Sequence, residues 1–313
     1  PEGTYTLTAV ATDNEGLSTT SAAVTVVVRK PTTRIYQSEE TDFWTTAQKW
    51  TPSVVPVASD TTIIRKGEVK STGIDQTAPL SVEPEGVFRL VGDCTVDDMV
   101  LLGGVVRSNT SNPLFILTSN ITVEENSTIW AGSVAASVFR IDGTISGSKN
   151  LEKTNVGVLN LNVDASGFSG VWTVSGGTLL ASKSDALGTG GVNVKSTDTL
   201  KIAAANETAF LNMEETSNLT LDADLTVAKA TLGNTKLAAG TYTSADYPNF
   251  ISGSGKLIVT EGEATGQKEL LVEADFTQIV PNPVLKTAWV LLSSERNQLC
   301  EIQIVGLDGT LIR

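Results

Sequence analysis

The feature that most constrains the fold is a long succession of short apolar strands interrupted by glycine-containing turns. The stretch SGVWTVSGGTLLASKSDALGTGGVNV, residues 169–194, is representative and carries only two charged residues, Lys183 and Asp185. Its glycines divide it into short apolar runs, which suit strands and turns better than helices. A chain of this kind is expected to fold into an all-β structure.

The pattern within the strands indicates that one face of each is buried. In VGVLNLNV, Leu159, Leu161 and Val163 alternate with Asn160 and Asn162, which is the period of two expected for a half-buried strand. Similar units recur about every 20–25 residues, a spacing typical of solenoids. No helical period of useful length is found.

A β-helix is favoured over a β-sandwich. Glycine and asparagine suit the tight corners between stacked coils, where positive φ is common. Only 5% of residues are aromatic, fewer than a series of sandwiches would be expected to contain, and parallel stacking lets each coil satisfy its backbone through the next. A sandwich remains the alternative fold. We predict an all-β chain built on a right-handed parallel β-helix, flanked by β-sandwich fragments.

Composition restricts the function classes. The formal net charge is −13, which disfavours binding to nucleic acid. The chain has no histidine, which excludes Ser-His-Asp and Cys-His catalysis and, with only Cys94 and Cys300, makes a zinc site untenable. The two cysteines are expected to be free thiols rather than a bridge. No apolar run approaches the length of a membrane span. No cofactor is predicted, except that calcium remains open.

One segment of the solenoid region resembles a known repeat. Residues 142–202, from DGTISGSKNLEKTN to TDTLKI, are similar to the autotransporter-associated passenger β-strand repeat, which implies a right-handed β-helix and no particular activity. The resemblance rests on Lys153, Leu159, Gly170, Gly177, Leu179, Ala186, Leu187, Gly188 and Gly190. Ser148 and Asn150 depart from the glycine pattern at its opening.

The first 30 residues read as the end of a separate domain. GTYTLTAVATDNEGLSTTSAAVTVVV alternates like two strands joined by a DNEG turn, and it resembles the last two strands of bacterial immunoglobulin-like repeats. Asp13, Asn14 and Glu15 form either an ordinary turn or a calcium site. The chain opens in what reads as mid-domain, so we expect it to be a fragment. The predicted domains are 1–30 for the sandwich end, 31–260 for the β-helix, 261–269 for a linker and 270–313 for a further sandwich fragment.

The last segment resembles the first half of the C-terminal sorting domain of the Bacteroidota type IX secretion system. The resemblance rests on PNP followed by two strands with a D-G-T turn; the final part of that domain is absent. The residues concerned are Pro281, Asn282, Pro283, Gly306, Asp308 and Gly309. It implies export through the periplasm to the cell surface or medium. The implied partners are the secretion machinery: an outer-membrane translocon, a shuttle or an attachment complex.

Aromatic residues at both ends of the β-helix region admit two interpretations. Trp44 and Trp50 either cover the open end of a long β core or form a sugar platform, and the first is favoured because an open sheet end needs cover. Tyr242, Tyr247 and Phe250 are expected to close the other end, in a segment that resembles the last coils of many β-helices.

Three functions remain open. The first is the non-catalytic C-terminal region of a large secreted or cell-surface protein, a β-helix stalk with a sorting signal. The second is a polysaccharide-binding adhesin module, with Arg89, Arg140, Trp130 and Trp172 as candidate glycan-binding residues. The third, and least favoured, is a polysaccharide lyase in which a lysine or arginine acts as base near calcium held by clustered aspartates. The candidate charges are Arg89, Arg107 and Arg140, with Asp93, Asp97 and Asp98. Arg89 and Arg140 both follow a Val-Phe pair, which predicts equivalent places in successive coils.

Overall fold

The fold was obtained as a computed structural model that describes residues 2–28, 30–71, 75–76, 79–108, 113–261, 276–280 and 289–292. Residues 75–76, 276–280 and 289–292 are described by their backbone. These ranges contain strands and one short 3₁₀-helix, η1 (Ala47–Lys49), and no α-helix. Accordingly, none of the described helices has the length and apolar character needed to cross a bilayer. The predicted all-β class is confirmed.

The N-terminal segment is a hairpin made of two short antiparallel ladders. Strand β1 (Gly3–Leu7) pairs with β4 (Val24–Val28), and β2 (Val10–Thr12) pairs with β3 (Ser18–Thr20). The Asp13 carboxylate accepts hydrogen bonds from the backbone N–H groups of Glu15 and Leu17, each at 2.9 Å, as an ordinary turn does. All described side chains of residues 2–28 are exposed.

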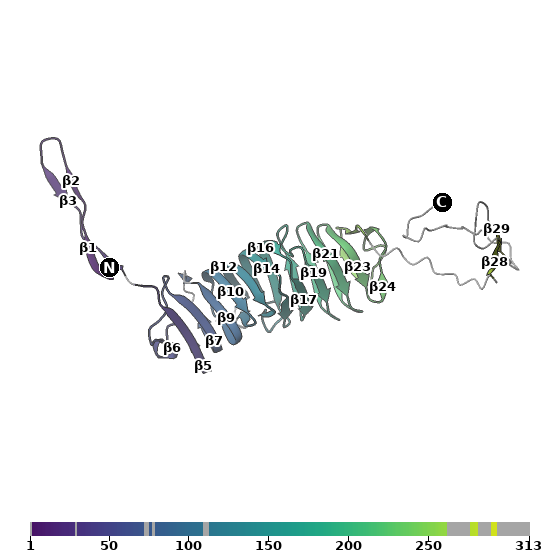
Figure 1. Cartoon of the computed structure of the whole chain (residues 1–313), viewed down its shortest axis with the longest axis horizontal. Helices are drawn as coiled ribbons and strands as arrows, with labels where there is room; N and C mark the ends of the chain where they lie inside the picture. Colours follow the sequence, from purple (N-terminus) through teal and green to yellow (C-terminus); the bar gives the residue numbers. More distant parts are fainter. Residues whose placement is uncertain are drawn as a thin grey trace. The chain divides into compact units, whose positions relative to one another are not determined.

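Residues 33–259 form a parallel β-solenoid of about 8 turns, whose strands follow one another along its axis (Figure 1). The predicted β-helix is therefore confirmed. Its strands are β5 (Thr33–Phe43), β6 (Trp50–Thr51), β7 (Thr61–Ser71), β8 (Asp75–Gln76), β9 (Leu80–Leu90), β10 (Cys94–Leu102), β11 (Val105–Ser108), β12 (Leu114–Glu125), β13 (Ser127–Trp130), β14 (Val138–Gly147), β15 (Leu151–Thr154), β16 (Val158–Phe168), β17 (Val171–Ser175), β18 (Thr178–Ala181), β19 (Gly191–Val194), β20 (Thr199–Ile202), β21 (Asn206–Met213), β22 (Asn218–Leu221), β23 (Leu225–Leu232), β24 (Thr235–Lys236), β25 (Gly240–Tyr242), β26 (Ile251–Gly253) and β27 (Leu257–Val259).

The backbone pairings define three parallel stacks of strand segments. Stack 1 runs from β8 and the start of β10 through β12, β14, β16, β18, β20 and β22 to β26. Stack 2 comprises the first parts of β5, β7 and β9, the later parts of β10, β12, β14 and β16, then the start of β21 and β23, and β27. Stack 3 comprises the last parts of β5, β7 and β9, then β11, β13, β15, β17 and β19, and the last parts of β21 and β23.

The core is built from rows of inward side chains that lie one above another. In stack 1 the register pairs each inward residue of one row with the equivalent residue of the next turn. The members of this row, each at most 1% exposed, are Phe115, Phe139, Leu159, Leu179, Leu200 and Leu219. Burial of one such side chain contributes about 1.5–3 kcal/mol. The alternation read from the sequence thus places one face of every strand in a continuous apolar interior.

Aromatic residues cover the first turns of the solenoid. Trp44 and Trp50 are 2% and 1% exposed, their ring centroids lie 4.9 Å apart, and the Trp50 indole N–H donates to the Trp44 carbonyl at 2.9 Å. Tyr36 packs edge-on against Trp50 at 5.5 Å. These rings are buried, so the interpretation as a cap is confirmed and an exposed sugar platform at the tryptophans is excluded.

The last turns are covered by a corresponding group of rings. Tyr242, Tyr247 and Phe250 pack against the core, and the Tyr242 and Tyr247 rings contact each other edge-on at 5.7 Å. The Tyr242 hydroxyl donates to the Ala238 carbonyl at 2.9 Å. The short strand β25 pairs antiparallel with β27 there, which ends the parallel stacking.

Some corners of the solenoid require glycine. Gly143 in β14 has φ +116°, and a Cβ at this position would lie 2.1 Å from the backbone oxygen of Ser119 in the turn below. The chain bends there from stack 1 towards stack 2. No L side chain fits without moving one of the two turns.

Residues 264–313 form a unit separate from residues 1–263. Within it, β28 (Phe276–Val280) pairs antiparallel with β29 (Trp289–Leu292). The residues assigned to a sorting signal, Pro281, Asn282, Pro283, Gly306, Asp308 and Gly309, lie outside the described residues, as does Cys300. Cys94 is buried in the solenoid core.

Candidate functional site

Five outward side chains on successive turns of stack 3 lie in one row. The register pairs Phe43 with Lys70, Lys70 with Arg89, Arg89 with Arg107, and Arg107 with Trp130. Neighbouring members are therefore separated by the strand spacing of about 4.8 Å. We call these five residues the cation row. It presents three cationic groups in succession, with an aromatic ring at each end.

A single carboxylate joins the two arginines of the cation row. Glu68 Oε1 accepts from Arg89 Nη1 at 3.0 Å, and Glu68 Oε2 lies 2.5 Å from Arg107 Nη2. The side chains of Arg89 and Arg107 are 21% and 28% exposed, and that of Glu68 is 11% exposed. Partial burial makes such charge-assisted bonds stronger than those of fully exposed pairs. The guanidinium groups are thus held in place on the surface.

The aromatic ends of the row contact its cations. The Arg107 guanidinium lies 5.2 Å from the centre of the Trp130 ring, and the Lys70 ammonium lies 5.2 Å from the centre of the Phe43 ring. These are cation–π distances. Trp130 is half-buried and Phe43 is 47% exposed, so both rings retain accessible surface.

Two of the four predicted glycan-binding residues do not belong to this row. Arg140 lies in stack 1, where its Nε donates to Asp142 at 2.7 Å, although its Val-Phe-Arg sequence matches that around Arg89. The expectation of equivalent places was wrong because β9 contributes its last residues to stack 3, whereas β14 begins in stack 1. Trp172 is 0% exposed and packs against Phe168 at 5.8 Å, so it is a core residue.

The residues considered for a lyase are distributed over the solenoid. Asp93 precedes β10 and accepts from the backbone N–H of Ile116 at 2.9 Å, and Asp98 accepts from the Asn120 amide at 3.4 Å. These bonds link neighbouring turns of stacks 1 and 2, whereas Arg89 lies in stack 3. Among the described residues, no group of three or more carboxylates and thiols could hold a metal ion.

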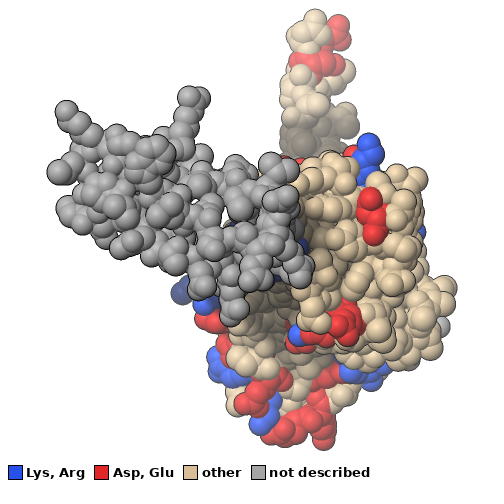
Figure 2. Space-filling model, turned by 90° about the vertical axis from the view of Figure 1, so that its right-hand side faces the viewer, with Lys and Arg blue, Asp and Glu red and all other residues tan. Residues whose placement is uncertain are grey.

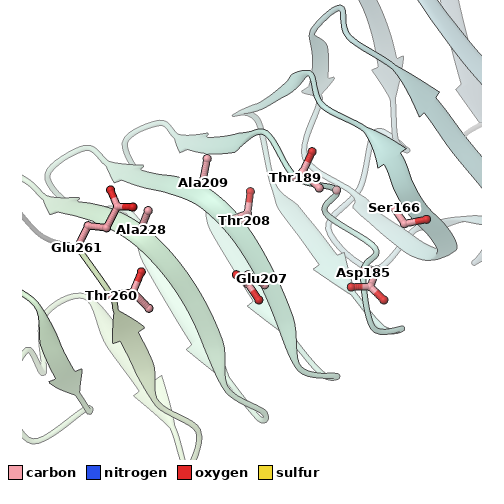
Figure 3. A pocket seen from close by; sticks show the side chains of 10 residues that line it. Ser166, Asp185, Thr189, Glu207, Thr208, Ala209, Ala228, Thr260 and Glu261 are labelled. Atoms are coloured by element: carbon pink, nitrogen blue, oxygen red, sulfur yellow. The ribbon is translucent and has the colours of Figure 1, made fainter.

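A hollow on stack 2 is a second candidate site (Figure 3). Its volume is about 360 Å³. Figure 3 shows its side chains on successive turns, with small and hydroxyl-bearing residues between three carboxylates. It is lined by Ser166, Asp185, Gly188, Thr189, Glu207, Thr208, Ala209, Ala228, Thr260 and Glu261. Its acidic lining is opposite in character to the cation row.

The hollow exists because one turn of stack 2 lacks a strand. Residues 182–190 form turns and bends between β18 and β19, with Asp185 at φ +59° and Gly188 at φ +74°. Ala186 and Leu187 still point inward and are 0% exposed. Ala186 and Leu187 belong to the segment that resembles the passenger repeat, and their burial holds this turn against the core. The surface outside the turn is recessed.

Sequence reasoning overlooked Phe43, Lys70 and Glu68 as parts of a site. The positions in the cation row are separated by unequal numbers of residues, because loops of different length join the strands. A search for a fixed period therefore does not find them.

Charges elsewhere on the described surface are mixed. In the view of Figure 2, Asp and Glu side chains lie interspersed with Lys and Arg, and large areas carry neither. Ion pairs such as Lys195–Glu214 (2.8 Å) and Lys201–Asp222 (3.0 Å) join neighbouring turns. Exposed pairs of this kind contribute about 0–1 kcal/mol each.

The fold and site define the chain as a parallel β-solenoid with a cation row on one face. No protein family, curated protein or solved structure matches the chain.

Proposed function

We propose that this chain is a non-catalytic part of a secreted, modular surface protein, in which the solenoid acts as a rigid spacer. The supporting observation is the single uninterrupted core that runs from Tyr36 to Val259 and is covered by aromatic rings at both ends. About 8 turns at about 4.8 Å each give a spacer of about 40 Å. Such a body sets the distance between the parts that it joins and carries out no reaction itself.

Export by the type IX secretion system forms the second part of the proposal. It rests on the resemblance of residues 270–313 to the sorting domain, and that of residues 1–30 to modular surface proteins. The machinery named above would be the partner, and the cell surface or the medium the destination. The net charge of −13 suits a soluble extracellular part.

The experiment removes codons 264–313 from the gene in the organism that encodes the chain. The matched control removes residues 1–30 instead and leaves the C-terminal unit in place. We expect the first truncation to be retained inside the cell, whereas the wild type and the control are digested by protease added outside. Surface exposure of the chain that lacks residues 264–313 would overturn the export proposal.

A second candidate function, binding of polysaccharide, is favoured by the cation row and is developed below.

A further inference from the structure

We propose that the cation row binds an anionic polysaccharide laid along the solenoid axis. The site is Phe43, Lys70, Arg89, Arg107 and Trp130, on the outer face of stack 3. The ligand class is a chain whose sugar units carry carboxylate or sulfate groups. This site is separate from the proposed spacer role and does not depend on it.

The spacing of the row is matched to a repeating anion. Lys70, Arg89 and Arg107 lie on consecutive turns at intervals of about 4.8 Å. This interval is close to the length that one sugar unit adds to an extended polysaccharide. The row therefore runs parallel to an extended chain and can contact those charged groups that face the solenoid, and a row held in place lowers the ordering cost of binding.

The chemistry of the side chains also favours such a ligand. A guanidinium group offers a planar fork of donors that fits carboxylate or sulfate oxygens. Glu68 divides one negative charge between Arg89 and Arg107 and so fixes their positions. Phe43 and Trp130 provide apolar surface at the two ends, against which sugar C–H groups can pack.

A nucleic acid is the other polyanion to be considered. Proteins bind single strands by stacking successive bases on aromatic side chains along a positively charged groove. The cation row has one ring at each end and three cations between them, so it offers no such series of stacking surfaces. A single-stranded oligonucleotide therefore serves as a discriminating probe.

The test measures binding of the full chain to four probes by isothermal titration calorimetry at low salt. The probes are polygalacturonate, dextran sulfate, uncharged dextran and a single-stranded oligonucleotide. We expect polygalacturonate, dextran sulfate or both to bind, with affinity that falls as salt is added. Comparison of the first two identifies the charged group. No binding of either, or equal binding of dextran or the oligonucleotide, would overturn the proposal.

Variants locate the site. Arg107→Gln and Lys70→Gln are each expected to raise the Kd at least tenfold, and Trp130→Ala at least threefold. Arg140→Gln is the matched control for Arg107→Gln, since Arg140 is also a partly exposed arginine in an ion pair but lies in stack 1. Lys70 has no part in the Glu68 pairs, so Lys70→Gln tests the site even if Arg107→Gln disturbs the fold. An equal loss in Arg140→Gln would show non-specific attraction and contradict the inference.

Discussion

At the scale of single residues, Lys153 is the position where burial and charge are in strongest conflict. It occupies an inward place of stack 3 between Ile129 and Val174 and is 0% exposed. Desolvation lowers the pKa of its ammonium group to about 8, against a partly compensating attraction to the Asp198 carboxylate. A lysine at this place therefore makes folding depend on pH.

The backbone supplies partners for this ammonium group. Lys153 Nζ donates to the carbonyl oxygens of Asn155, Gly157 and Gly176, at a corner where two turns meet. Asn155 has φ +68°, and its side-chain amide donates to the Gly132 carbonyl of the preceding turn. The Lys153 ammonium group thus supplies hydrogen-bond donors to carbonyl oxygens at this tight corner.

The first prediction concerns Lys153→Met. Between pH 8 and 10.5 the unfolded chain retains a proton on Lys153 that the folded chain has lost, so its contribution to the unfolding free energy rises with pH. Over that window the wild type should gain about 3 kcal/mol relative to Lys153→Met. Urea unfolding at pH 7, 8.5 and 10 measures the difference, from which other titrating groups cancel. A pH-independent difference would contradict the assignment.

At the scale of elements, the paired strand segments determine which side chains meet. Each outward row collects one residue from each turn, and each inward row does the same for the core. Glycine corners such as Gly143 allow a long strand like β14 to serve two stacks in succession. The position of a corner therefore decides to which face the following residues belong.

The second prediction is that Gly143→Ala destabilises the solenoid by about 3 kcal/mol, because the added Cβ meets the Ser119 oxygen and φ is positive. Gly167→Ala is the control: a Cβ there would come no closer than 3.4 Å, to the Ser146 side chain, and φ is not in the left-handed region. It should change stability by less than about 1 kcal/mol. Chemical denaturation of both variants measures the contrast, and equal effects would refute the argument.

At the scale of the whole molecule, the described apolar core is confined to the solenoid. All members of the large apolar core lie between Tyr36 and Val259. The hairpin of residues 2–28 adds no buried side chain to it, and residues 264–313 form their own unit. The stability of the solenoid should therefore be a property of residues 31–263.

The third prediction follows from this separation. A chain of residues 31–263 should unfold cooperatively, with a thermal midpoint within about 3 °C of the corresponding transition in the full chain, because no core contact is removed. Circular dichroism near 218 nm follows the loss of strands in both proteins. A midpoint lowered by more than about 8 °C would indicate that the flanking segments contribute to the core.

The sequence by itself determined the class of fold. Alternating residues such as Leu159 and Asn160 determine strand orientation, and glycine or asparagine corners determine where strands end. Both signals are local, so they can be read from the sequence without knowledge of the fold. The burial of Trp44 and Trp50 followed from the same reasoning, since the end of a solenoid must be covered.

Only the tertiary structure decided which side chains share a face. Arg89 and Arg140 have the same neighbours in sequence but lie in different stacks, and Trp172 belongs to the core rather than to the surface. Lys70, Arg89 and Arg107 meet although unequal loops separate them. The physical reason is that the register between two turns depends on the combined length of all strands and corners that separate them, which no short pattern contains.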